Sequence, residues 1–276
     1  MKKVFIVTFA VIISFVLCLP ISAARASISS TYGTPVIDGE IDDIWATTEV
    51  RDVKLVDKEV IPSESTTTGV VRTMWDEKYF YALVVVDKNG IAVYNGLVNE
   101  NNDAVELGYT DSGIFDGLNN VSNDADITAG DFRVDANGVL SGFGGYYLAC
   151  AADSSFKGAY KKIAEDQYLC EFAIPWKNAT PTVGNKVSME VQINDNAEGS
   201  GRTGLVTWAS TPSFGWRDSA VHGEVVLAAA PVVEEVKTEI TNENPITADS
   251  STIAYILIVL SVIGGSLTFK KFNKQK

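Results

Sequence analysis

An aromatic residue in a loop is the first feature of the chain that could do chemistry. Trp216 lies within residues 213–218, a turn-forming stretch between two segments of strand-like sequence. An indole held beside Arg217 and Asp218 offers a flat apolar surface next to polar groups, which suits a ligand with an apolar face and many hydroxyls. Sugars have this character. The alternative is that the ring folds back as a plug over the edge of the core.

Three expected strands each carry one long polar side chain among apolar neighbours. Glu106, Arg133 and Gln192 alternate with apolar residues along the chain, so each points away from the core face of its strand. A carboxylate, a guanidinium and an amide can donate to and accept from neighbouring hydroxyl groups in pairs. An ordinary solvated strand face shows the same alternation and is the alternative interpretation.

The elements that would position these residues are short apolar runs separated by turns, from residue 31 to residue 227. The runs predict two hairpins and two further strands, over residues 70–75 with 79–86, 131–134 with 139–140, 168–174, and 187–193. No segment of this region has a long apolar period of 3.6 residues. We therefore predict an all-β domain, an antiparallel β-sandwich of jelly-roll or immunoglobulin type.

The N-terminus has the pattern of an export signal. A short basic start precedes an apolar run from Val4 to Leu19, and small residues at positions 23, 24 and 26 offer cleavage sites. We predict that residues 1–26 are a signal peptide.

The C-terminus has the pattern of a membrane anchor. Residues 228–251 form an acidic stretch without aromatic residues, which predicts a flexible linker. Residues 253–269 carry no charge and would span ~25 Å as a helix, slightly less than the ~30 Å hydrocarbon core. The basic tail at 270–276 would remain on the cytoplasmic side.

Residues 244–248, Asn-Pro-Ile-Thr-Ala, resemble a Gram-positive sortase sorting signal of the Leu-Pro-x-Thr-Gly type, with Asn244 in place of Leu and Ala248 in place of Gly. The resemblance implies attachment to peptidoglycan by sortase. A permanent single-pass anchor is the alternative. Either one predicts a protein displayed at the surface of a Gram-positive cell.

The net charge of the body indicates which class of partner the protein does not bind. Seven of the 22 basic residues lie in the two terminal segments, which leaves 15 basic and 35 acidic residues and a net charge of −20 in the body. Such a field repels nucleic acid, so we expect no nucleic-acid partner.

Only Cys150 and Cys170 remain in the body, either as a pair or as buried thiols.

Six sequence blocks resemble the family 9 carbohydrate-binding modules of bacterial xylanases. In family order, they are GTPVIDGEIDDIW (33–45), WDEKYFY (75–81), DAVE (103–106), FRV (132–134), VQIND (191–195) and WRD (216–218). The resemblance covers essentially all of residues 31–227. It implies a β-sandwich with structural calcium that binds sugar chains at their reducing ends.

The resemblance also implies site residues. The matching positions are Trp216 for one of two sandwiching rings, with Glu106, Arg133 and Gln192 as hydrogen-bonding groups. Two further positions depart from the family's pattern: Glu100 stands where the second Trp is expected, and Ser213 stands where an Asn is expected. Tyr94, in the same loop as Glu100, could supply the missing ring.

Oxygen donors for the implied calcium are abundant. Asp38 and Asp42 in the opening loop, Asp87, and the tract from Asp111 to Asp131 supply the carboxylates that a hard cation prefers. Solvated acidic loops of an exported protein have the same composition.

The sequence favours a non-catalytic protein that binds plant-type or other polysaccharide chains, such as xylan or cellulose, in carbohydrate catabolism or adhesion. One alternative is a glycoside hydrolase that uses Glu106 and a nearby Asp. A second is a haem-binding electron-transfer sandwich with His222 and either Met74 or Met189 as axial ligands. A third is an adhesin that contacts polymers through its surface rather than a pocket.

Overall fold

The computed structural model describes residues 25–61, 64–88, 90, 92, 94, 101–111, 129–197, 201–212, 214–215 and 218–231. The chain divides into two units, Met1–Val232 and Val233–Lys276, and every described residue belongs to the first. Within these ranges, no helix has both the length and the apolar character needed to cross a membrane. The expected signal peptide up to residue 24, the sorting motif and the apolar run at 253–269 lie outside the described residues.

The described part of the first unit is built almost entirely of strands. They are β1 (Ser27–Tyr32), β2 (Arg51–Val53), β3 (Leu55–Val56), β4 (Thr68–Trp75), β5 (Tyr79–Asp87), β6 (Ala104–Thr110), β7 (Gly130–Asp135), β8 (Leu140–Phe143), β9 (Lys157–Lys162), β10 (Gln167–Pro175), β11 (Lys186–Asp195), β12 (Gly204–Thr207) and β13 (Gly223–Leu227). The helical elements there are η1 (Asp43–Thr47), α2 (Gly144–Ala152) and η3 (Ser219–Val221).

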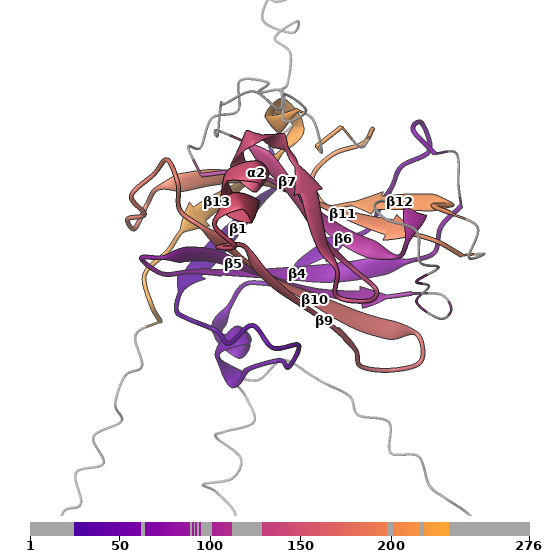
Figure 1. The fold of residues 1–276 in the computed structure, drawn as a ribbon, viewed down its shortest axis with the longest axis horizontal. Helices are drawn as coiled ribbons and strands as arrows, with labels where there is room; N and C mark the ends of the chain where they lie inside the picture. Colours follow the sequence, from indigo (N-terminus) through magenta and orange to yellow (C-terminus); the bar gives the residue numbers. More distant parts are fainter. Residues whose placement is uncertain are drawn as a thin grey trace, which may run out of the picture. The chain divides into compact units, whose positions relative to one another are not determined.

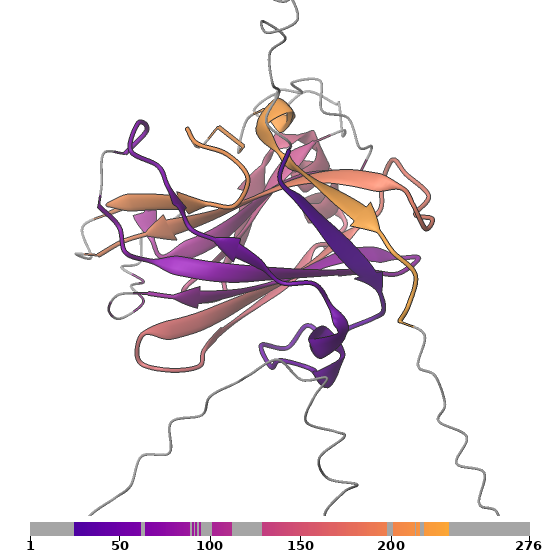
Figure 2. The same cartoon turned by 180° about the vertical axis from the view of Figure 1, so that it is seen from behind.

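The strands form one continuous sheet in the order β8-β7-β6-β11-β13-β1-β4-β5-β10-β9. We call β8, β7, β6, β11, β12 and β13 sheet A, and β2, β4, β5, β10 and β9 sheet B. β1 connects the two, and Figure 2 shows it between β13 and β4. The sheet folds back so that the two halves face each other, as Figure 1 shows. The predicted all-β sandwich is confirmed.

One part of the fold prediction is wrong. β1 pairs in parallel with β13 over residues 27–30 and with β4 over residues 31–32, so the sandwich is not purely antiparallel. β1 also begins at Ser27, four residues before the expected start of the domain. Its sequence, SISSTY, alternates too weakly to predict a strand that joins both sheets.

The core lies between the sheets because apolar residues alternate with polar ones along the strands. Val105 and Leu107 of β6 point inward, as do Phe80 and Ala82 of β5, and all four are buried. Tyr109 stacks on Phe80 with ring centroids 4.9 Å apart. Cys150 and Cys170 are both free thiols within this layer, so they do not pair.

A second apolar cluster lies on the outer face of sheet B. Trp45 of η1 packs with Met74 of β4 and with Tyr81 and Leu83 of β5, all nearly inaccessible to solvent. Since Tyr81 and Leu83 alternate with the inward-facing residues of β5, they belong to the opposite face. The segment around η1 therefore covers this side of sheet B.

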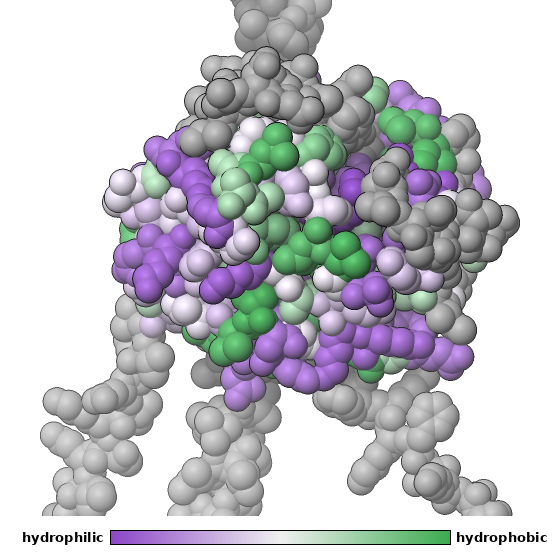
Figure 3. Space-filling view, viewed as in Figure 1, coloured by the Kyte–Doolittle hydropathy of each residue, from purple (hydrophilic) through white to green (hydrophobic). Residues whose placement is uncertain are grey.

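The free edge of sheet B is protected by charge. β9 pairs only with β10 in the sheet order and carries Lys157, Lys161 and Lys162. Lysines on an edge strand discourage pairing with another chain. Figure 3 shows the corresponding hydrophilic band along the lower edge of the molecule, over the β9–β10 hairpin.

Both predicted hairpins are confirmed, and each has a carboxylate in its turn. Between β7 and β8, Asp135 Oδ1 accepts from the backbone N–H of Asn137 and of Val139, each at 2.9 Å. Gly138 has φ +76°, a conformation that glycine adopts readily. The turn places Arg133 of β7 beside Ser141 of β8.

Candidate functional site

The structure places three of the residues singled out from the sequence in one cross-strand row. Arg133 of β7 lies directly opposite Glu106 of β6, and Glu106 lies directly opposite Gln192 of β11. All three point to the outer face of sheet A, because their immediate neighbours on each strand belong to the core. We call Arg133, Glu106 and Gln192 the polar row.

Glu106 is the centre of the hydrogen bonding in the polar row. Its Oε1 accepts from Arg133 Nε and from Asn194 Nδ2, each at 2.6 Å, and its Oε2 accepts from Gln192 Nε2 at 3.0 Å. The Arg133 contact is also an ion pair. The arrangement orients a carboxylate, a guanidinium and two amides toward one another and limits their rotamers.

The polar row is shielded from water, which excludes the alternative of an ordinary solvated strand face. Glu106 is 2% exposed, Gln192 4% and Arg133 6%. Burying an ion pair is costly unless its remaining hydrogen-bonding capacity is satisfied. Such a dry, preorganised set of donors and acceptors is suited to recognising a polar ligand rather than to general solubility.

Asn194 and Arg202 join the row although the sequence analysis did not select them. Asn194 Oδ1 accepts from Gln192 Nε2 at 3.0 Å and from Arg202 Nη1 at 3.2 Å. Asn194 follows Gln192 at the period of two along β11, so the strand pattern contained a signal for it. Arg202 comes from the segment between β11 and β12, which has no periodicity from which its position could be predicted.

Asp131 is a further polar residue on this face, two residues before Arg133 on β7. It is 1% exposed, and its two carboxylate oxygens have no hydrogen-bond partner among the described residues. Burial and the negative charge of Glu106 raise the pKa of Asp131 well above its ordinary value, although Arg133 and Arg202 oppose this. Burial therefore favours the neutral form of Asp131, which can donate as well as accept a hydrogen bond.

The loop that leads to Trp216 is anchored beside the polar row. A Cβ on Gly215 would lie 2.4 Å from Glu190 Cγ, and a Cβ on Gly108 would lie 2.5 Å from the Gly215 oxygen. Only glycine at both positions permits this close approach. Gly108 lies two residues beyond Glu106 on β6, and Glu190 lies two residues before Gln192 on β11. The backbone at 215 therefore rests on the sheet next to the row.

His222 holds this loop in place. Its Nε2 lies 2.7 Å from the Gly215 oxygen and its Nδ1 lies 3.1 Å from Ser188 Oγ. Because a carbonyl oxygen can only accept, Nε2 carries the proton and Nδ1 accepts from the serine hydroxyl. Burial lowers the pKa of His222 to about 4, so the ring is neutral at pH 7. His222 therefore acts as a structural anchor.

Of the remaining predicted sugar-binding residues, only Tyr94 is described, and it is not joined to the polar row. Trp216 and Ser213 lie outside the described residues. Tyr94 is 42% exposed and makes no hydrogen bond or ring contact with another described residue. Sheet A thus brings together Glu106, Arg133 and Gln192, and the aromatic part of the predicted site stays a prediction.

Among the described residues, the three aspartates expected to bind calcium do not gather with other His, Cys, Asp or Glu side chains into a metal-binding group. Asp38 accepts from the Glu40 N–H, Asp42 from the Val36 N–H, and Asp87 from Gln167 Nε2. The described ranges contain no group of three or more His, Cys, Asp or Glu side chains that could hold a metal ion. Residues 112–128, most of the acidic tract, lie outside those ranges, so calcium stays a prediction without a located site.

The haem alternative finds no support in the geometry. Met74 lies in the outer cluster of sheet B, whereas Met189 lies in the core between the sheets. Both ring nitrogens of His222 are occupied by Ser188 and Gly215. The three proposed axial ligands therefore do not face a common space.

Comparison with known proteins connects this geometry to a family. The family model described as carbohydrate family 9 binding domain-like matches residues 37–230. Endo-1,4-beta-xylanase A of Thermotoga maritima is 34% identical over 200 residues, which is 72% of this chain and 17% of the xylanase. Exoglucanase XynX of Acetivibrio thermocellus is 33% identical over 205 residues, 74% of this chain and 17% of the exoglucanase. The chain thus spans about a sixth of the length of these relatives.

Solved structures share the fold. A family 9 carbohydrate-binding module from Caldicellulosiruptor kristjanssonii in complex with glucose has a TM-score of 0.62 and 23% identity, and the match covers 79% of this chain and all of that one. A second structure, in complex with cellotriose, gives the same values. At this identity the similarity shows the fold alone. The family model matches well over half of the chain, so the protein belongs to the carbohydrate family 9 binding domain-like family.

Proposed function

We propose that this protein is a non-catalytic carbohydrate-binding protein that recognises polysaccharide chains of the xylan or cellulose type through the outer face of sheet A. The observation that carries the proposal is the buried polar row, in which Glu106 is held by Arg133 and Gln192. Paired donors and acceptors in a dry setting match the vicinal hydroxyl groups of a sugar. The family, and the glucose and cellotriose bound to structurally similar modules, support this ligand class.

Trp216 completes the proposed site with an aromatic ring. It follows Gly215 directly in the sequence, and Gly215 is anchored beside the row by Glu190 and His222. One stacking ring contributes ~1–3 kcal/mol by analogy with base stacking, which is about 5- to 150-fold in affinity. Tyr94 would supply a second ring if its loop closes over the ligand, and Ser213 would add a hydroxyl.

Titration calorimetry with cellotriose and xylotriose tests the proposal. We expect saturable binding that Trp216→Ala weakens about 5- to 150-fold. Gln192→Met should weaken it by tenfold or more, because the ligand loses an amide partner in a dry site. Glu64→Gln is the matched control, because Glu64 forms only an exposed pair with Lys58. Absence of binding by the unmodified protein, or retention of full affinity by both site variants, would refute the proposal.

Reducing-end recognition has its own test. Borohydride converts the terminal ring of cellotriose to an open alditol and leaves the other two rings unchanged. If the site holds the reducing end, the reduced sugar should bind at least tenfold more weakly. Equal affinity for the two forms would instead indicate binding along the chain.

Glycoside hydrolysis is the alternative function, and the surroundings of Glu106 argue against it. A hydrolase needs one carboxyl group free to give up a proton and a second free to attack or to activate water. Glu106 accepts from three side chains and is paired with Arg133, so it is held as a binding group. Release of reducing sugar from xylan or cellulose, abolished in Glu106→Gln, would overturn the binding-only proposal.

We also propose that the protein is displayed at the surface of a Gram-positive cell. The support is in the sequence: a signal peptide at 1–26, a linker at 228–251, the sorting-like motif at 244–248 and an apolar run at 253–269. Mass spectrometry of the cell-wall fraction should find a C-terminal peptide that ends at Thr247 and is joined to peptidoglycan. An intact C-terminus in the membrane fraction would indicate a permanent anchor, and recovery from the cytoplasm would refute surface display.

A further inference from the structure

A cavity of about 570 Å³ lies against the outer face of sheet B, on the opposite layer from the polar row. Its floor is one cross-strand row in which Tyr81 of β5 pairs with Ala173 of β10, and Ala173 pairs with Lys157 of β9. Ala173, the smallest side chain of the row, lies between two longer ones and is 1% exposed. The volume is in the usual range for a small-molecule site.

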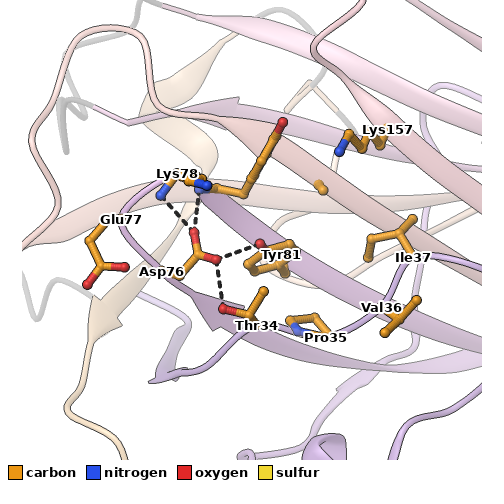
Figure 4. A pocket seen from close by; sticks show the side chains of 11 residues that line it. Thr34, Pro35, Val36, Ile37, Asp76, Glu77, Lys78, Tyr81 and Lys157 are labelled. Carbon is orange, nitrogen blue, oxygen red and sulfur yellow. Dashed lines mark hydrogen bonds between the residues drawn. The ribbon is translucent and has the colours of Figure 1, made fainter.

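The walls of the cavity come from two distant parts of the chain. Residues 34–37 form one side and the β4–β5 turn at 76–78 forms the other, as Figure 4 shows. Asp76 joins them, because its Oδ2 accepts from Tyr81 Oη at 2.7 Å and from Thr34 Oγ1 at 2.8 Å. Its Oδ1 accepts from two backbone N–H groups of the turn. The walls are therefore preorganised.

The carboxylate of Asp76 is occupied by these contacts. Burial alone would raise its pKa, but the hydrogen bonds from Tyr81, the turn backbone and Thr34 outweigh burial and lower it. Glu77, at the rim, accepts from the Tyr32 hydroxyl at 2.6 Å. Neither carboxylate forms an ion pair with a lysine of the cavity.

Two lysines of the cavity have no carboxylate partner. Lys78 and Lys157 form no ion pair among the described residues, and Lys157 Nζ lies 5.2 Å from the centroid of the Tyr79 ring. Lys161 on the same strand is paired with Glu40, and Lys177 is paired with Asp153. The chain as a whole is acidic and repels anions, so it is these two ammonium groups at one cavity that favour an anionic ligand there.

We propose that this cavity is a second binding site, for a hexuronic acid residue. The apolar face of the pyranose ring lies against the partly exposed Tyr79 ring, and the carboxylate pairs with the ammonium groups of Lys78 and Lys157. A neutral sugar would leave both ammonium groups without an anion. The site does not depend on the proposed function of sheet A, because it uses none of the residues of the polar row and lies on the other layer.

Calorimetry of the full chain with methyl β-D-glucuronide tests the proposal, with methyl β-D-glucoside and benzoate as comparison ligands. We expect the glucuronide to bind at least tenfold more tightly than either, since only it combines the ring hydroxyls with a carboxylate. Lys157→Met and Lys78→Met should each weaken binding about tenfold while keeping their apolar stems. Raising the salt concentration should weaken it further.

Lys162→Met is the matched control, because Lys162 is an exposed lysine of the same strand that does not line the cavity. It should change the affinity less than twofold. Glu106→Gln should also leave glucuronide binding unchanged, which separates this site from the one on sheet A. The proposal is overturned if the glucuronide does not bind, if benzoate or the glucoside binds equally well, if neither lysine variant weakens binding, or if Glu106→Gln abolishes it.

Discussion

Replacing Glu190 with glutamine should raise the free energy of unfolding at pH 8 and leave it nearly unchanged at pH 4. Glu190 is 2% exposed on β11, and burial raises its pKa from 4.5 to about 7 against the hydrogen bonds it accepts. At ~1.4 kcal/mol for each pH unit, this rise corresponds to a cost of ~3 kcal/mol for holding the charge in the folded state.

The direction of this change in the free energy of unfolding follows from the protonation of Glu190 in the folded and the unfolded chain. Below pH 4.5 the carboxyl group is protonated in both the folded and the unfolded chain, so folding carries no charge penalty. Between pH 4.5 and 7 the folded state binds more protons, so stability falls as the pH rises. Above pH 7 the whole penalty is present. A glutamine has no such penalty at any pH.

The geometry allows glutamine to replace Glu190 without losing the contacts. Oε1 of Glu190 accepts from the backbone N–H groups of Val191, Trp208 and Ala209, and the glutamine oxygen can do the same. Oε2 accepts from Ser210 Oγ at 3.0 Å, and an amide nitrogen there can donate to that hydroxyl instead.

Urea unfolding at pH 4 and at pH 8 measures the effect. We expect Glu190→Gln to gain up to ~3 kcal/mol at pH 8 and to change by less than ~1 kcal/mol at pH 4. Glu64→Gln is the control, because its exposed pair with Lys58 contributes at most ~1 kcal/mol. Equal destabilisation of Glu190→Gln at both pH values would refute the reasoning, because the hydrogen bonds and not the buried charge would then dominate.

Three further predictions concern other buried groups. Arg133→Met should lower the free energy of unfolding by ~3–5 kcal/mol, because it leaves Glu106 buried without its cation. The pKa of His222 is lowered from 6.5 to about 4, so its contribution to stability is lost as the pH falls through this window, opposite in sign to that of Glu190, and the difference in free energy of unfolding between the wild type and His222→Gln should shrink as the pH falls. Cys150 and Cys170 should not react with a thiol reagent at pH 8 in the folded protein, because both are buried and burial raises the pKa of Cys150 to about 11.

Each of these predictions has an outcome that would count against it. Lys54→Met, which removes an exposed pair with Asp52, should cost less than ~1 kcal/mol, and a loss from Arg133→Met no larger than this would show that the buried pair contributes little. A difference in free energy of unfolding between the wild type and His222→Gln that stays constant between pH 6.5 and 4 would contradict the assignment of His222. Rapid labelling of either thiol without denaturant would contradict its burial.

The alternation of polar and apolar residues was enough to predict which face Glu106, Arg133 and Gln192 occupy. Their distance from one another was not predictable from alternation, because it depends on the strand order β7-β6-β11, which joins segments far apart in the sequence. Cross-strand register then places all three opposite one another. It was the resemblance to the family 9 modules that grouped these three residues in one expected site.

The burial of the polar row was harder to predict. The loop at Gly215 reaches sheet A only because Gly108 and Gly215 lack side chains and His222 closes the contact. Single glycines in a loop or a strand have many uses, so their type alone does not identify a packing contact. Asp131 follows the same period of two as Arg133, but its position at the end of an acidic tract suggests a calcium ligand rather than a member of the sugar site.

The side-chain amides of Gln192 and Asn194 offer the most direct test of the central claim, that the buried row on sheet A contacts the sugar. In a nitrogen-15 NMR titration with cellotriose, we predict that both amide signals shift saturably and that Glu106→Gln reduces the shifts together with the affinity. The signals of Ala173 and Lys157 on the opposite layer should stay in place. Saturable binding that moves the sheet B signals and leaves the amides of Gln192 and Asn194 unchanged would contradict the account.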